Sequence, residues 1–204
     1  MRENRIFITG AVAVGLAVIA ATALKGQLST VAYSDEDGPG PNLVIEVKGE
    51  ANGTVVIDLM PEVAPKHVEQ IVALANRGAY NGVAFHRVIE GFMAQTGDVE
   101  FGRPDQDMSR VGTGASDLPD LPAEFSDIAF DRGIVGMARS TDPDSGNSQF
   151  FIMFKEGHFL NGQYTVVGHV VSGMEIVDQI KRGEAGSGAV AAPADVMNTV
   201  LVEE

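Results

Sequence analysis

Short runs of β-branched and aromatic residues, separated by turn residues, dominate the chain from Leu43 onward. Residues 43–47 and 54–59 form two such runs, and Asn52-Gly53 between them favours a hairpin because both residues tolerate positive φ. The same pattern predicts further short strands, which cover residues 83–89, 92–97, 133–138, 149–153, 165–170 and 196–202.

Two stretches have helical rather than alternating periodicity. The first begins near Ala64-Pro65, with the proline in its first turn, and ends at Gly78. Its apolar face consists of Val68, Ile71, Val72 and Ala75. The second spans residues 174–181, and its apolar face consists of Met174, Val177 and Ile180. Many short strands with only two helices predict a mainly-β fold, either an antiparallel barrel or a sandwich.

The N-terminus has a different pattern. Arg2 and Arg5 precede an uncharged, largely apolar run at residues 6–24, which is typical of a secretory signal and is close to the roughly 20 residues that span a bilayer. We expect residues 1–32 to be a signal peptide or an uncleaved membrane anchor; a buried helix is the third alternative. Residues 33–42 are charged and rich in glycine and proline, which predicts a linker before a single domain at residues 43–204.

Composition narrows the possible functions. Apolar residues make up 45% of the chain and charged residues 21%, as in an ordinary globular protein. The chain has 14 basic and 28 acidic residues, and its formal charge of −14 argues against nucleic-acid binding, which requires a basic surface. The absence of cysteine excludes a disulfide framework, a thiolate nucleophile and a Cys-ligated metal.

The chain has no complete nucleotide, metal or hydrolase motif. Residues 112–117 begin like a dinucleotide loop but have aspartate at the third glycine. Residues 142–147 begin like a calcium loop, yet Met153 stands where the loop requires glutamate. The four histidines lack ligand spacing, and neither Ser145 nor Ser148 lies in a Gly-x-Ser-x-Gly elbow. We therefore expect neither a metal nor a cofactor.

Two longer stretches are far more specific. The first is Phe-His-Arg-Val-Ile-Glu-Gly-Phe-Met-Ala-Gln-Thr-Gly-Asp at residues 85–98. The second joins Gly-Ile-Val-Gly-Met-Ala at residues 133–138 to Ser-Gly-Asn-Ser-Gln-Phe-Phe-Ile at residues 145–152. Both resemble the cyclophilin family of peptidyl-prolyl cis/trans isomerases, and the resemblance continues through residues 159–162, 167–170 and 173–178. It runs in order from about Asn42 to Val202.

This resemblance implies a closed eight-stranded antiparallel barrel capped by two helices, with a groove on one face for proline-containing peptides. It places the active site at Arg87, Phe92, Met93 and Gln95. It places further groove residues at His86, Ala138, Arg139, Gln149, Phe151, Phe159, Leu160 and Tyr164.

Four positions depart from the family pattern. Glu90 stands where many members have proline, and Arg139 where many have asparagine. Phe159 and Tyr164 stand where the eukaryotic cyclosporin-sensitive members have tryptophan and histidine, which indicates a bacterial-type groove.

The chemistry of X–Pro rotation suits Arg87. Rotation breaks no covalent bond, so it requires no nucleophile, and its barrier is the amide resonance of about 18–20 kcal/mol. In the twisted bond the prolyl nitrogen becomes a hydrogen-bond acceptor, so a fixed guanidinium stabilises the twisted state alone. Arg87 cannot lose its charge. The alternative for Arg87 is a surface ion pair, and for the aromatic, methionine and amide residues an ordinary place in the core.

We therefore expect an exported prolyl isomerase that assists folding outside the cytoplasm, in a bacterial periplasm or anchored in the membrane facing it. Its partners would be proline-containing polypeptides. We expect a monomer that touches the membrane only through residues 1–32, if these are retained. The alternative function is a proline-peptide-binding chaperone or assembly factor in which catalysis is incidental.

Overall fold

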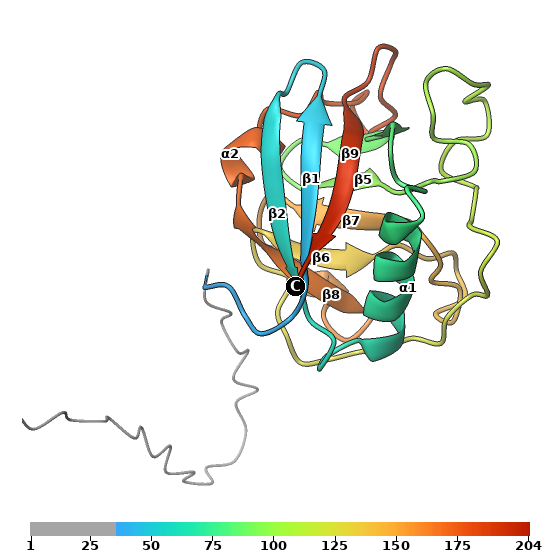
Figure 1. Ribbon diagram of the computed structural model, residues 1–204. Coiled ribbons are helices and arrows are strands. Elements are labelled where there is room, and N and C mark those ends of the chain that lie inside the picture. Colours follow the sequence, from blue (N-terminus) through green and yellow to red (C-terminus); the bar gives the residue numbers. More distant parts are fainter. Residues whose placement is uncertain (1–35) are drawn as a thin grey trace, which may run out of the picture.

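The computed structural model describes residues 36–204, and the proposed signal or anchor at residues 1–32 lies outside them, as do linker residues 33–35. One antiparallel sheet of nine strands forms the body of the protein (Figure 1). The strands are β1 (Asn42–Lys48), β2 (Gly53–Leu59), β3 (Val83–Ala84), β4 (Arg87–Ile89), β5 (Met93–Thr96), β6 (Ile134–Met137), β7 (Phe150–Met153), β8 (Val166–Ser172) and β9 (Val196–Glu203). The helices are α1 (Pro65–Asn76), α2 (Met174–Val177) and the 3₁₀ turn η1 (His158–Leu160).

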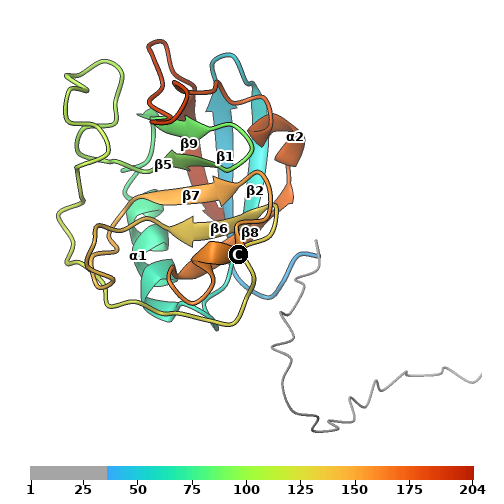
Figure 2. The ribbon, with the colours of Figure 1, turned by 180° about the vertical axis from the view of Figure 1, so that it is seen from behind.

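The sheet curls into two layers that enclose the main core. Its strand order is β3-β9-β1-β2-β8-β6-β7-β5-β4. Strands β1, β2 and β9 form one layer and β5, β6 and β7 the other, with α1 and α2 on opposite sides of the curled sheet (Figures 1 and 2). The buried side chains between the layers include Ile45, Ile57, Phe85 and Phe150.

The expectation of a closed eight-stranded barrel is wrong in detail. The sheet has nine strands, and no ladder within residues 36–204 joins its two edge strands, β3 and β4. The run at residues 83–89, expected as one strand, is split at Phe85 and His86, because β3 pairs with β9 whereas β4 pairs with β5. These two buried residues carry the chain from one edge of the sheet to the other.

Two further boundaries differ from the sequence prediction. The β1–β2 hairpin forms, but Val47 pairs with Gly53 and the connection between the strands comprises residues 49–52, so Asn52-Gly53 is not a two-residue turn. Helix α2 ends at Val177 rather than near residue 181. The backbone N–H of Lys181 donates to Asp195 Oδ2 at 2.6 Å, which takes it out of the helical pattern.

Helix α1 has the predicted apolar face, with one addition. Val68, Ile71 and Ala75 are buried and Val72 is partly buried. Leu74 is also buried, together with the polar residues His67 and Gln70, which the apolar pattern did not reveal. Within residues 36–204 no helix has the length and apolar character of a membrane span.

Candidate active site

A second apolar cluster lies on the outer face of the β5–β6–β7 layer. Because side chains alternate along a strand, Phe150 of β7 enters the main core, where its ring meets Tyr80 edge-on, whereas Phe151 points outward. The Phe151 ring stacks on Phe130 with centroids 5.8 Å apart. Gly136 of β6 permits this stacking, since a Cβ there would lie 2.5 Å from the Phe151 ring.

A cavity of about 270 Å³ opens on this outer cluster. Its lining comprises Arg87, Phe92, Met93, Gln95, Ala138, Arg139, Phe151, Phe159, Leu160 and Tyr164. The structure thus brings together ten of the twelve site residues expected from the sequence, and leaves out His86 and Gln149. The individual roles of the ten residues remain predictions.

Arg87 contributes the cationic edge of the cavity. Its Nη1 donates to Gln95 Oε1 at 3.3 Å, and its Nε donates to the carbonyl of Ser187 at 3.2 Å. No carboxylate of residues 36–204 forms an ion pair with it. Glu90, the acid nearest in sequence, pairs instead with Arg182 Nε at 2.6 Å. The alternative of a surface ion pair for Arg87 is therefore wrong for this structure.

A chain of amides fixes the orientation of Gln95. Gln95 Nε2 donates to Gln149 Oε1 at 3.0 Å, and Gln149 Nε2 donates to the carbonyl of Gly114 at 2.9 Å. Each amide thereby presents its oxygen toward Arg87, so the oxygen of Gln95 is the atom that meets the guanidinium. Gln149 is absent from the lining of the 270 Å³ cavity but lines the cavity that adjoins it.

The loop that ends this chain is held by a buried carboxylate. Asp98 is 0% exposed. Its Oδ2 accepts the backbone N–H groups of Gly112 (2.6 Å) and Gly114 (3.1 Å), and its Oδ1 accepts that of Phe101 (2.9 Å). Asp98 therefore positions the carbonyl of Gly114 that orients Gln149.

His86 lies beneath the site instead of lining it. Its side chain is buried, and burial lowers its pKa against the opposing effect of the nearby Asp98 carboxylate. The ring is therefore neutral at pH 7. This placement matches the structural alternative for His86 and corrects the expectation that it faces the groove.

The open side of the cavity is aromatic. Phe92 and Phe159 lie with ring centroids 5.5 Å apart, and Phe159 is 66% exposed. On another part of the rim, Tyr164 meets Phe151 edge-on and carries the guanidinium of Arg139, whose Cζ lies 4.4 Å from the ring centroid. The rim thus presents flat apolar surfaces to a bound chain.

A second cavity of about 460 Å³ adjoins the first and shares three of its lining residues, Gln95, Ala138 and Arg139. Its other walls come from residues 112–115, from Asp120 and from the loop that precedes β7. Among these, Asn147 accepts from Ser116 through Oδ1 and donates to the Leu118 carbonyl through Nδ2 at 3.0 Å, which ties the two walls together.

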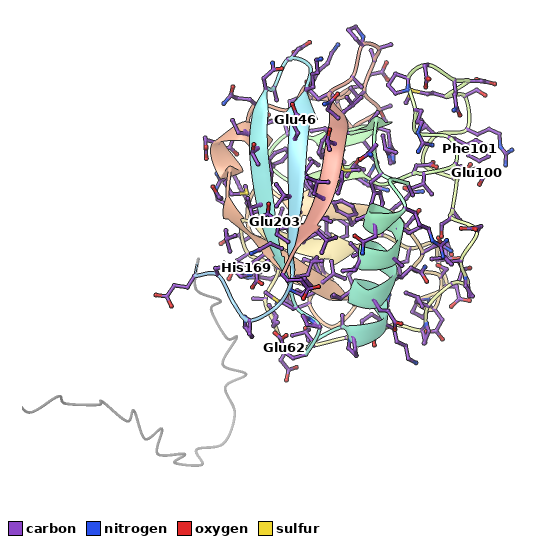
Figure 3. The ribbon with its side chains drawn as sticks, viewed as in Figure 1. Glu46, Glu62, Glu100, Phe101, His169 and Glu203 are labelled. Atoms are coloured by element: carbon purple, nitrogen blue, oxygen red, sulfur yellow. The ribbon has the colours of Figure 1, made fainter. Side chains whose placement is uncertain are left out.

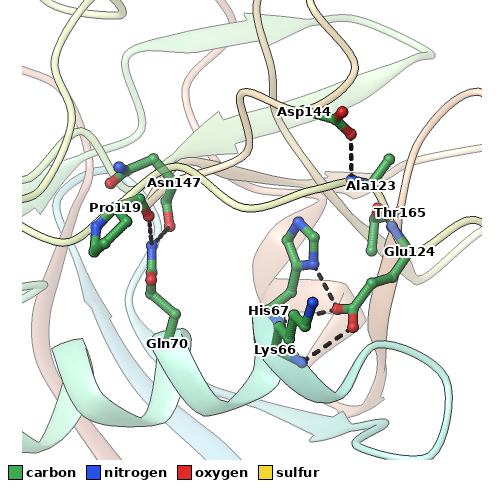
Figure 4. A network of polar contacts seen from close by, with 9 residues as sticks. All are labelled: Lys66, His67, Gln70, Pro119, Ala123, Glu124, Asp144, Asn147 and Thr165. Atoms are coloured by element: carbon green, nitrogen blue, oxygen red, sulfur yellow. Dashed lines mark hydrogen bonds and ion pairs between the residues drawn. The ribbon is translucent and has the colours of Figure 1, made fainter.

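Helix α1 is joined by polar contacts to the loops around this second cavity (Figure 4). Gln70 Nε2 donates to the carbonyls of Pro119 (3.2 Å) and Asn147 (3.0 Å). His67 Nδ1 lies 2.7 Å from Glu124 Oε2, which also accepts the N–H of His67 at the start of the helix. Although burial opposes the shift, these hydrogen bonds lower the pKa of Glu124. The polar face of α1 therefore anchors the loops that form the groove.

One group of potential metal ligands lies outside both cavities. Among residues 36–204, the ligand atoms of Asp131, Glu156 and His158 come within 4.8 Å of one another. The sequence spacing did not reveal this group because Asp131 is far from the other two in the chain. His158 Nε2 already lies 2.7 Å from Asp131 Oδ1, and all three side chains are at the surface.

The family follows from a direct match. Residues 43–202 fit the family model described as cyclophilin type peptidyl-prolyl cis-trans isomerase/CLD. The chain belongs to this family. This cyclophilin is 56% identical over 190 residues to a probable peptidyl-prolyl cis-trans isomerase of Brucella suis biovar 1 (strain 1330), a match that covers 91% of this chain and 94% of the relative. It is 34% identical to peptidyl-prolyl cis-trans isomerase CYP18-1 of Arabidopsis thaliana, over 67% of this chain and 81% of the relative.

Solved structures agree with this assignment. The cyclophilin AquaCyp293 from Hirschia baltica superposes with a TM-score of 0.66 at 26% identity, covering 81% of this chain and 74% of that one. A cyclophilin-type isomerase of Cryptosporidium parvum, crystallised in the presence of the dipeptide Ala-Pro, has the same fold, with a TM-score of 0.66 at 23% identity over 80% of this chain and 99% of that one. This cyclophilin is a peptidyl-prolyl cis-trans isomerase.

Proposed function

We propose that the 270 Å³ cavity holds the proline ring and that Arg87 donates a hydrogen bond to the prolyl nitrogen as the X–Pro bond twists. The observation that carries this proposal is the position of the Arg87 guanidinium, which lines the same cavity as Phe92, Met93 and Phe151 and forms no ion pair with any carboxylate of residues 36–204. In an ion pair, a carboxylate would already compensate the charge of the guanidinium. Arg87 instead offers its charge where the imide nitrogen becomes an acceptor.

The energies agree with a catalyst that needs more than one contribution. A charge-assisted hydrogen bond contributes about 1.5–3 kcal/mol, which corresponds to about ten- to a hundredfold in rate. The planar amide is more polar than the twisted one, so transfer from water into the cavity lined by Phe92, Met93 and Phe151 disfavours the ground state further. Arg87 therefore stabilises the twisted state, whereas the apolar residues of the lining destabilise the planar ground state, and both effects lower the same barrier.

The experiment that tests this function is exchange NMR on a short X–Pro peptide with catalytic amounts of the protein. Uncatalysed exchange takes tens to hundreds of seconds, so acceleration is measured against a slow background. We expect acceleration that saturates with peptide concentration. Folded protein that leaves the exchange rate unchanged would contradict the proposal.

A proline-peptide-binding chaperone or assembly factor is the second candidate. The 460 Å³ cavity beside the first favours it, because this cavity extends the groove beyond the space that a proline ring requires. An enzyme accelerates X–Pro exchange in its substrate, whereas a binding module acts only by binding the unfolded chain. Suppression of aggregation of a proline-containing unfolded protein by stoichiometric amounts of this cyclophilin, retained in Arg87→Ala, would support the binding function.

We further propose that the protein assists folding of exported proteins in a bacterial periplasm, or anchored in the membrane facing it. This proposal rests on Arg2 and Arg5 before the apolar run at residues 6–24, with proline-containing polypeptides as partners and a monomer as the acting form. Cell fractionation and N-terminal sequencing of the native protein test it. A mature terminus near residue 33 indicates a cleaved signal, and an intact terminus in the membrane fraction indicates an anchor; an intact terminus in the cytoplasm would exclude export.

A further inference from the structure

Arg139 is a second fixed cation in the groove. It lines both cavities, so it lies at the boundary between the proposed proline site and its neighbour. Its Nε and Nη2 donate to the carbonyl of Gln163 at 3.1 and 3.0 Å, and its Nη1 donates to the carbonyl of Ser140 at 2.9 Å. The guanidinium lies over the Tyr164 ring. These contacts hold the charge in place before any peptide arrives.

The groove differs in charge from the rest of the molecule. The chain has twice as many acidic as basic residues, and exposed acids such as Glu46, Glu62, Glu100 and Glu203 are spread over its surface (Figure 3). The ten residues around the proline cavity include two arginines and no carboxylate. Neither arginine belongs to an ion pair with any of residues 36–204. A positively charged cavity in an acidic protein attracts acidic segments and repels basic ones.

Arg139 retains the capacity to bind a carboxylate. A guanidinium has five N–H donors, of which the bonds to Gln163 and Ser140 use three. Because the planar group is already immobilised on Tyr164, a ligand that meets it loses little additional side-chain entropy. Arg87, by contrast, directs donors at Gln95 and, in the proposed mechanism, at the prolyl nitrogen. Arg139 can therefore bind the substrate residue that lies beside the proline.

We propose that this cyclophilin prefers substrates with an acidic residue next to the proline, and that Arg139 determines this specificity. The proposal rests on the peptide-binding function proposed above. The preference is confined to the position at Arg139, because the neighbouring cavity also contains Asp120, a carboxylate whose Oδ1 accepts from Asn147 Nδ2 at 2.9 Å. Farther along the groove, both signs of charge are present and no acidic preference is expected.

The test uses the full-length protein and short peptides that carry Glu, Gln or Lys at the position directly before or directly after the proline. For one of these two positions, we expect kcat/KM for the Glu peptide to exceed that for the Lys peptide by about three- to tenfold. An effect of this size lies between that of an exposed ion pair and that of a charge-assisted hydrogen bond. The ratio should fall toward one as salt is raised, because added ions screen charges that face solvent.

Substitutions of Arg139 test whether this residue causes the difference in kcat/KM between the Glu and Lys peptides. Arg139→Gln should bring the Glu/Lys ratio close to one, and Arg139→Lys should leave an intermediate ratio because it keeps the charge but loses the planar contact with Tyr164. Arg77→Gln removes an exposed arginine that pairs with Asp117 at the end of α1 and should keep the wild-type ratio. Circular dichroism confirms that each variant is folded.

The outcomes separate this inference from the function on which it rests. Equal kcat/KM for all three peptides would overturn the acidic preference, while acceleration of the Gln peptide would still support the isomerase mechanism. A preference that survives in Arg139→Gln would overturn the role of Arg139. If exchange is not accelerated, dissociation constants of the same peptides decide, since tighter binding of the Glu peptide that Arg139→Gln abolishes supports the inference without catalysis.

Discussion

Arg87 Nη1 donates to Gln95 Oε1 at 3.3 Å, and this contact connects the proposed catalytic group to a chain of buried amides. The amide of Gln95 is oriented by Gln149, and Gln149 is oriented by the carbonyl of Gly114. Because the oriented Gln95 amide fixes one donor of the Arg87 guanidinium, we expect the remaining donors to stay directed into the cavity. Catalysis in this cyclophilin is thus expected to depend on residues that do not touch the proline.

Gln95→Ala tests this dependence. Without the amide oxygen, Arg87 samples other orientations, so we expect kcat to fall by about tenfold, as for loss of one hydrogen bond to a charged group. The measurement is exchange NMR at saturating peptide, which separates kcat from binding. Gln179→Ala removes an exposed amide whose Nε2 donates to the Glu175 carbonyl, and it should leave kcat unchanged. An unaltered kcat in Gln95→Ala would show that Arg87 needs no such support.

The adjacent residues Phe150 and Phe151 provide a second test, because they face opposite sides of β7. Phe150→Leu should lower the free energy of unfolding by about 1 kcal/mol and leave KM unchanged, since Phe150 lies in the main core. Phe151→Leu should raise KM severalfold because its ring lines the cavity proposed to hold proline. Urea denaturation and steady-state kinetics measure the two effects. Equal changes in KM for both variants would contradict this division of roles.

Glu124 makes stability depend on pH. Its pKa is lowered in the folded state, so the stabilisation it contributes is present above the ordinary glutamate pKa of about 4.3 and is lost as pH falls through the lower folded value. Glu124→Gln should therefore be less stable than wild type by about 1–2 kcal/mol at pH 7. The difference should shrink as the pH falls below about 4.

Urea denaturation at a series of pH values measures this difference. Glu69→Gln removes an exposed carboxylate from the same helix, α1, and serves as the control for loss of charge. A gap between wild type and Glu124→Gln that stays constant down to pH 3 would show that the bonds to Lys66 and His67 do not favour the ionised carboxylate.

Local periodicity in the sequence predicts most of the strands, and contiguous motifs that resemble the cyclophilin family name the candidate site residues. Helix α1 lies where helical periodicity predicts it, and ten of the candidate site residues line one cavity. The split of residues 83–89 was not evident, since nothing local to Phe85 and His86 indicates that the chain changes edges there. Curling of the whole sheet imposes that break.

Long-range polar contacts are the other feature that the sequence alone did not reveal. Glu124 binds His67 across 57 positions, and Gln149 reaches Gly114 across 35. Such pairs have no periodic signature, because each partner is an ordinary polar residue until the fold brings the two together. The same holds for Arg139, whose departure from the family pattern is visible in the sequence but whose placement on Tyr164 is not.

The most direct test of the central claim compares Arg87→Ala and Arg87→Lys with wild type by exchange NMR at saturating X–Pro peptide, with dissociation constants measured in parallel. We expect kcat to fall by about ten- to a hundredfold in Arg87→Ala while peptide affinity changes less than threefold, because the lost hydrogen bond forms only in the twisted state. Arg87→Lys should recover part of the rate. Full activity in Arg87→Ala, or a loss explained entirely by weaker binding, would contradict the account.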